Sequence, residues 1–176
     1  SKVYFRLPFE GDLLLNTMLR FKLDVTEYYP LDATANADNI SAANIGLYTA
    51  ASFIKKISIK NNDKIIDTLD SNFIVTHQKL HLNSENFTKF TKMSSYLHNK
   101  NNRIIDKYLD KTIVYVTLPL PFWFTKSPGS ALPMWALTDH NIGIEVELSD
   151  YGLPSGLTTF IHDVELLTNY GYLAQS

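Results

Sequence analysis

Residues 118 to 137 read LPLPFWFTKSPGSALPMWAL, and this stretch carries much of the information on the fold. Successive side chains of a strand point to opposite faces. The alternation that starts upstream therefore predicts a strand with one apolar face, formed by Val114, Val116, Leu118, Leu120, Phe122 and Phe124. Pro119 and Pro121 have no N–H to donate, so we expect an edge position, a strand end or a bulge there.

The second half of the stretch predicts a turn followed by a returning segment. Ser127, Pro128 and Gly129 are turn residues. The segment 131–137 is expected to return as a lid over the end of the barrel, and the aromatic side chains to supply buried area. If Trp123 is buried, its replacement by alanine costs on the order of 3 kcal/mol. The predicted packing motif consists of Pro119, Pro121, Phe122, Trp123, Phe124, Gly129, Leu132, Pro133 and Trp135.

The same alternation recurs along the rest of the chain. It is clearest at 142–148, and it predicts further strands at 3–7, 19–25 and 160–166. The turn-forming sequence Asn61-Asn62-Asp63 joins two more strands into a hairpin. Strands do not alternate with helices, so we expect an antiparallel sandwich or barrel rather than a parallel α/β sheet.

Two stretches depart from the strand pattern. Residues 27–49 are rich in Ala, Asn and Asp and read as a long loop. Residues 71–98 hold the helical signal, where Phe87, Phe90 and Leu97 recur at helical spacing. Asn83 or the residue after it is expected to cap this short helix.

Composition excludes several classes of protein. The chain has 176 residues, 45% of them hydrophobic, which suits one domain with a real core. There is no cysteine, so disulfides and thiolate metal sites are excluded. The net charge of −2 gives no basic excess, and we expect no sequence-specific binding of nucleic acid. The longest apolar runs are too short for a transmembrane segment.

Candidate catalytic and metal-binding residues are few. Phosphate-binding loops of the GxxxxGK[ST] and GxGxxG types are absent. His77 and His81 have the spacing of two ligands on one helix face, but a third ligand is missing, so a solvated helix or loop is favoured. His162 is expected on the inner face of the last strand as a buried structural histidine. We therefore expect no enzyme activity, no metal and no cofactor.

The string PLPFWFTKSPGSALPMWAL, residues 119–137, resembles a motif in the major capsid proteins of nucleocytoplasmic large DNA viruses. In that family an apolar strand ends in PLPFWF and is followed by a turn with a glycine, an ALP-led segment and a strand with a histidine near its start. The counterparts here are residues 119–124, Gly129, residues 131–133 and His140.

The resemblance implies a fold and a function. The family folds as two jelly rolls in one chain, and three chains form a capsomer. We therefore expect an eight-stranded antiparallel jelly-roll sandwich over residues 1–176, with a short helix in a long inter-strand excursion. The chain has room for one jelly roll and starts without Met, which favours the first barrel of a longer chain over a single-barrel relative.

The expected function is that of a structural subunit of a viral capsid shell. The resemblance implies trimeric capsomers of the full-length protein, contacts with other capsid proteins, location in the virion and assembly in the host cell cytoplasm. The loop at 27–49 and the excursion at 71–111 are the candidate contact regions.

Three alternatives remain open. One is a penton or minor capsid protein with a single jelly roll. Another is a carbohydrate-binding jelly-roll module, for which exposure of Trp123 and Trp135 is the discriminating observation. The third is a cupin-like enzyme, which requires clustered His and carboxylate ligands, whereas the five His residues are scattered along this sequence.

Overall fold

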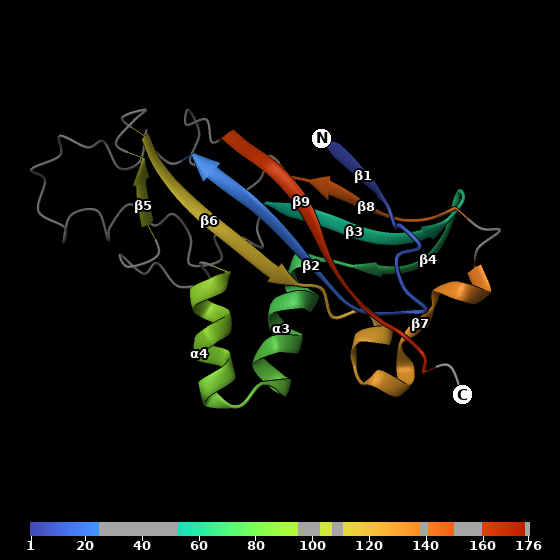
Figure 1. Cartoon of the computed structure of the whole chain (residues 1–176). Coiled ribbons are helices and arrows are strands. Elements are labelled where there is room, and N and C mark those ends of the chain that lie inside the picture. Colours follow the sequence, from blue (N-terminus) through green and yellow to red (C-terminus); the bar gives the residue numbers. More distant parts are fainter. Residues whose placement is uncertain (25–52, 95–102, 107–110, 138–140, 150–159, 175–176) are drawn as a thin grey trace, which may run out of the picture.

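The computed structural model describes residues 1–24, 53–94, 103–106, 111–137, 141–149 and 160–174 (Figure 1). The strands are β1 (Lys2–Arg6), β2 (Leu13–Asp24), β3 (Ile54–Asn61), β4 (Lys64–Leu69), β5 (Arg103–Asp106), β6 (Lys111–Pro119), β7 (Leu132–Pro133), β8 (Ile142–Leu148) and β9 (Phe160–Gly171). The helices are α3 (Ser71–His81) and α4 (Ser84–Met93), and the short 3-10 turns are η2 (Trp123–Thr125), η3 (Pro128–Ser130) and η4 (Met134–Leu137).

The strands form two antiparallel sheets. One has the order β1-β8-β3-β4. In the other, β5-β6-β2 continue to β9, and the start of β2 also pairs with β7. Neighbouring strands that lie far apart in the sequence are the mark of a jelly roll, so the predicted fold is confirmed. Leaving aside the two-residue β7, the described residues hold eight strands, as expected.

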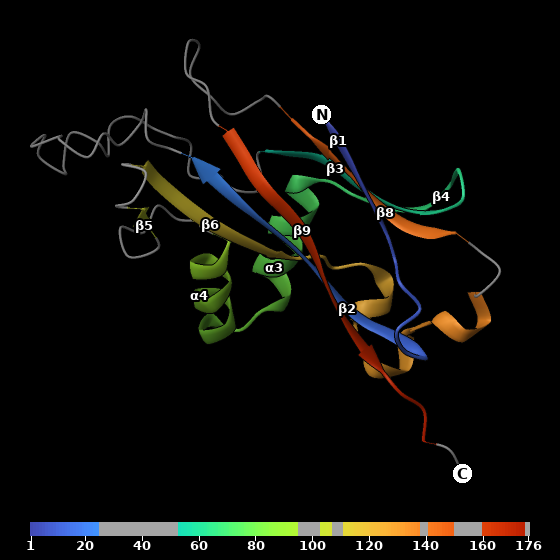
Figure 2. The ribbon, with the colours of Figure 1, turned by 45° about the horizontal axis from the view of Figure 1, so that its top comes forward.

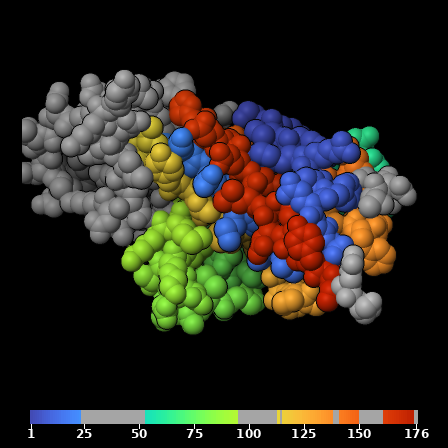
Figure 3. Space-filling view, viewed as in Figure 1, coloured from blue at the N-terminus to red at the C-terminus, as the bar shows by residue number. Residues whose placement is uncertain are grey.

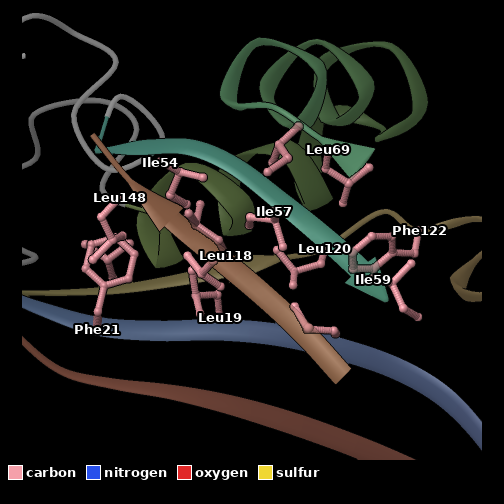
Figure 4. Packing of buried hydrophobic residues seen from close by; sticks show 14 of the residues in the cluster. Leu19, Phe21, Ile54, Ile57, Ile59, Leu69, Leu118, Leu120, Phe122 and Leu148 are labelled. Carbon is pink, nitrogen blue, oxygen red and sulfur yellow. The ribbon is translucent and has the colours of Figure 1, made fainter. Parts of the chain in front are cut away.

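The core lies between the two sheets. Alternate side chains of β3 and β8 face those of β2 and β6 across the sandwich (Figure 4). This explains the period-two pattern, because each strand has one face in the core and the other toward solvent. The fully buried side chains include Leu14, Leu19, Phe21, Ile54, Ile57, Ile59, Val116, Leu118, Ile144 and Val146.

The hairpin between β3 and β4 forms where the turn residues predicted it. Asn62 has a φ of 53°, in the left-handed region that asparagine tolerates better than most residues. The two strands pair on both sides of this turn, with Asn61 opposite Lys64. The hairpin prediction is therefore confirmed.

Two helices follow β4, where the sequence predicted one. The Asp70 carboxylate accepts a hydrogen bond from the Phe73 N–H and caps α3, while Asn83 caps α4 through the Asn86 N–H. The Asn83 cap was predicted, but α3 as a separate helix was missed. Its apolar spacing is obscured because Gln78 occupies a buried position beside Ile74. The two helices lie side by side next to β6 (Figures 1 and 2).

A β-bulge in β9 makes the predicted face wrong for the part of the strand before the bulge, whereas Val164 and Leu166 pack against the core as predicted. The register against β2 shifts between Arg20 and Lys22, and Asp163 in the bulge has a φ of 51°. One extra residue reverses the alternation, so that Ile161 packs against the core. His162 is consequently exposed, and the expectation that it is a buried structural histidine is wrong.

The link between β1 and β2 is held by the end of β9. The Tyr170 hydroxyl donates a hydrogen bond of 2.6 Å to the Pro8 carbonyl, and the Tyr172 hydroxyl donates one of 2.8 Å to the Glu10 carbonyl. The Asp12 carboxylate accepts the Leu173 N–H at 2.7 Å. In the space-filling view, the red C-terminal part of the described chain lies against its blue N-terminal part (Figure 3). The connection from β1 in one sheet to β2 in the other is thus held by groups from the opposite end of the described chain.

Ion pairs connect the three strands β1, β8 and β3 on the outer face of their sheet. Glu145 lies 2.8 Å from the Lys60 Nζ and 3.6 Å from the Lys2 Nζ, and Glu147 lies 2.7 Å from the Lys55 Nζ. The hydrogen bond from Lys60, with a further contribution from the Lys2 charge, lowers the pKa of Glu145 below its ordinary value of 4.5.

Acidification is expected to remove the contribution of Glu145 to stability. Because its pKa is lower in the folded state, the stabilisation is complete above about pH 4.5 and is lost as the pH falls through the folded-state value. In thermal melts between neutral pH and about pH 3, Glu145→Gln should melt below the wild type at neutral pH, and the gap should close in acid. The control Glu85→Gln removes an exposed helix pair with Lys89 and should change little. A gap for Glu145→Gln that persists in acid would refute the electrostatic explanation.

Some expectations concern segments outside the described residues. These are the loop at 27–49 and His140. Within the described part, β5 is a short strand that the sequence analysis did not predict. Of the helices described, none combines the length and hydropathy needed to cross a membrane.

Candidate functional site

The predicted packing motif begins at the end of β6. Pro119 is the last residue of this strand and pairs with Met18 of β2. The next N–H, that of Leu120, donates to the Thr17 carbonyl at 3.0 Å, after which Pro121 leaves the ladder. The prolines therefore occupy a strand end, one of the predicted positions. The prediction that the strand continues to Phe124 is wrong, because the chain turns into η2.

Phe122 and Phe124 are the buried anchors of the motif. Both side chains are fully buried, and their rings stack with centroids 5.6 Å apart. Phe122 and Leu120 lie next to Ile59 of β3 in the core (Figure 4). The 3-10 turn allows this arrangement, since the Thr125 N–H and hydroxyl both donate to the Phe122 carbonyl, at 3.0 and 2.9 Å. The segment thereby joins the two sheets through apolar contact.

The two tryptophans of the motif are exposed. Trp123 has 36% of its surface accessible and contacts the Phe124 ring edge to face, with centroids 5.2 Å apart. Trp135 is 60% exposed. The expectations of a buried Trp123 and of Trp135 as a lid are therefore wrong. The reason is the turn conformation, which directs Trp123 away from the core while its neighbours Phe122 and Phe124 point inward.

The turn after η2 is held by its serines. The Ser127 N–H donates to the Ser130 hydroxyl at 3.1 Å, and Pro128 occupies the first position of η3. A methyl group added at Gly129 would approach only the Ser127 hydroxyl, at 4.0 Å. An alanine side chain at this position would thus cause no steric clash.

The returning segment is attached to β2 through Asp12. Leu132 and Pro133 form β7 opposite the start of β2, and the Met134 N–H donates to the Asp12 carbonyl at 2.8 Å. Leu132 packs against the core and Met134 is fully buried, so methionine rather than Trp135 is the inward side chain. Asp12 thus joins this segment to the end of β9.

The paired histidines lie on α3. Their rings stack with centroids 4.1 Å apart, and the His81 Nδ1 donates to the His77 carbonyl at 2.9 Å. Among the described residues, no group of three or more His, Cys, Asp or Glu side chains is placed to hold a metal ion. The arrangement described so far performs packing, and we assign no chemical step to it.

Residues 1–169 match the family model described as the major capsid protein N-terminus. The chain belongs to the major capsid protein family. The resemblance recognised in residues 119–137 is therefore confirmed at the level of the family. No curated protein is similar enough in sequence to be counted as a relative.

Solved structures of capsid proteins share the fold of this major capsid protein segment. PBCV-1 VP54, in a crystal structure fitted into a cryo-EM reconstruction of the virophage Sputnik, superposes with a TM-score of 0.67 at 16% identity. A quasi-atomic model of the PBCV-1 virus capsid gives a TM-score of 0.65 at 18% identity. Each match covers 99% of this chain and 38% of the other, so the chain spans less than half the length of these relatives.

Proposed function

We propose that this chain is the first jelly roll of a longer structural subunit of a viral capsid shell. The observation that carries the proposal is the match of residues 1–169 to the N-terminal part of the major capsid protein family. The 38% coverage of the PBCV-1 chains supports a second domain of comparable size in the complete protein. The role is mechanical, without a catalytic step or a cofactor.

We infer that complete subunits associate as trimers and with other capsid proteins in the virion, after assembly in the host cytoplasm. Exposed apolar side chains supply contact surface for such neighbours. The largest exposed fractions belong to Leu80 with 75%, Tyr172 with 74% and Trp135 with 60%. Leu80 and Trp135 lie outside the packed core, whereas Tyr172 also bonds to the Glu10 carbonyl.

The oligomeric state of the full-length protein tests this proposal. Light scattering over a dilution series is expected to give three times the mass of one chain, since capsomers are closed symmetric assemblies. The isolated 176-residue segment serves as the comparison for the contribution of the first jelly roll. A full-length protein that stays monomeric at every concentration would contradict the trimer. A reading frame without a second jelly-roll pattern would instead favour a single-barrel penton or minor capsid protein.

A carbohydrate-binding module is the second candidate, and one observation favours it. Trp123 and Trp135 are exposed, as stacking on sugar rings requires. If the full-length protein did not assemble and its tryptophan fluorescence changed across a glycan panel, this candidate would replace the capsid role. The family match makes the capsid role the better supported of the two.

A further inference from the structure

A cleft of about 690 Å³ lies between α3, the first half of β2 and the segment that follows β6. Its volume falls in the range of small-ligand sites. The cleft is separate from the packed core, although Thr17 and Leu120 border both. Its walls come from three parts of the sequence that only the fold brings together.

The ionisable side chains that line this cleft are all basic. They are His77 and His81 of α3 and Lys126 after η2, while β2 and the end of β6 contribute no titratable group. Burial lowers the pKa of His77, and the neighbouring His81 and Lys126 lower it further. His77 is therefore mostly neutral in the free chain at neutral pH, and Lys126 supplies a positive charge, without a carboxylate among the described lining residues.

Two residues that line the cleft each have a buried polar atom without a hydrogen-bond partner within the described part of the chain. The two atoms are the Thr17 Oγ1 and the His77 Nδ1. Thr17 is only 2% exposed, so its hydroxyl has little access to bulk solvent. Buried polar atoms of this kind destabilise a fold unless a partner satisfies them. After a small shift of the cleft wall that exposes the two atoms, a ligand with acceptor oxygens would satisfy the hydroxyl and, once the imidazole is protonated at Nδ1, the ring nitrogen as well.

The remainder of the lining is apolar. Met18, Leu120, Pro119 and Pro121 form one side, and Phe73 of α3 borders the cleft with 47% of its surface exposed. A ligand that is only a small inorganic anion leaves this surface uncovered. The combination fits an anionic head joined to an apolar body.

We propose that this cleft binds a carboxylate carried on an apolar body, with Lys126, His77 and the Thr17 hydroxyl directed at the carboxylate. Two sources share this chemistry: an acidic side chain between apolar neighbours in a peptide, and a small organic acid. The site does not depend on the proposed capsid role, because every group invoked lies in this chain. Divalent metal is disfavoured by the lysine and by the lack of a third metal ligand in the described residues.

Binding is tested with matched acid and amide probes on the 176-residue chain. The small-molecule arm compares 4-phenylbutyrate with 4-phenylbutyramide, and the peptide arm compares acetyl-Phe-Glu-Leu-amide with its Gln analogue. Calorimetry should give the acid at least about tenfold tighter binding than the amide in one arm or both. The arm with the tighter acid identifies the source. Acids and amides that bind equally, or acids that do not bind, would overturn the proposal.

The pH dependence gives a second readout. A bound carboxylate raises the pKa of His77, so protonation accompanies binding and the acid should bind more tightly at about pH 6 than at about pH 8. The groups that face His77 are His81 on its own helix and Lys126 opposite. Affinity for the acid that does not change over this range would contradict the role of His77.

Variants separate the site from general effects on stability. Lys126→Met should weaken acid binding about tenfold, whereas Lys79→Met on the same helix but outside the cleft should leave it unchanged. Thr17→Val removes the unpartnered hydroxyl, so it should raise the melting temperature of the free chain and weaken acid binding. Weaker folding together with unchanged binding in Thr17→Val would refute the assignment.

Discussion

Phe122→Ala is expected to destabilise the chain by about 3–5 kcal/mol, the usual cost of truncating a buried aromatic side chain. Phe122 has no exposed surface and stacks on Phe124, and it lies next to Ile59 of the opposite sheet (Figure 4). Its removal leaves a cavity where the two sheets meet. Urea unfolding followed by circular dichroism measures the loss, because this signal does not depend on the tryptophans.

Trp123→Ala is the matched control in the same turn. Trp123 is larger than Phe122, but it is 36% exposed and touches the core only through the edge of Phe124. Its replacement should cost about 1 kcal/mol, in the range of a partly exposed aromatic pair. The sequence analysis gave Trp123→Ala a cost on the order of 3 kcal/mol on the condition that Trp123 is buried, and its exposure removes that condition. Equal losses for the two variants would contradict the assignment of Phe122 as the anchor.

Gly143→Ala is expected to destabilise the chain by about 3 kcal/mol, at the upper end of the overpacking range. A methyl group at this position would lie 2.2 Å from the Tyr4 hydroxyl and 2.7 Å from the Phe5 carbonyl oxygen. The clash is difficult to relieve because β8 is held between β1 and β3, with Gly143 opposite Arg6 on one side and Lys60 on the other. Thermal and urea unfolding should both report the loss.

Two comparisons make the Gly143 prediction specific. Gly129→Ala adds the same methyl group where the nearest atom is 4.0 Å away, and it should be close to neutral. The double variant Tyr4→Ala/Gly143→Ala removes the side-chain part of the clash but leaves the Phe5 carbonyl. It should lose less than the sum of the two single losses. Similar losses for both glycine variants, or strict additivity, would contradict the steric explanation.

The sequence predicted the sandwich well because strand periodicity is a local signal. Residues 142–148 alternate without interruption, and the structure places Ile142, Ile144 and Val146 in the core. The bulge at Asp163 could not be predicted from strand periodicity. An inserted residue changes the face of a strand, but its sequence looks like ordinary alternation. The exposed position of His162 follows from that single residue.

The candidate sites were harder to predict because they depend on how distant segments meet. The sequence motif at 119–137 identified the family. The direction of its aromatic side chains depends on the 3-10 turn, in which Phe122 faces inward and Trp123 outward. The cleft was even harder to predict, since its lining residues Thr17 and Lys126 lie more than a hundred positions apart in the sequence and meet only in the fold. Only the paired spacing of His77 and His81 gave a local sign of it, and for that spacing the sequence analysis favoured a solvated helix or loop.

The hydrogen bonds of Tyr170 and Tyr172 to the link between β1 and β2 have a consequence for how the chain folds. They join residues 162 positions apart in the sequence. Contacts with such long separation carry a large loop-closure entropy and form slowly. The first crossover of the jelly roll therefore reaches its final conformation only after β9 has been synthesised and paired with β2. A nascent chain that lacks this last strand has its first two strands present but not yet locked in place.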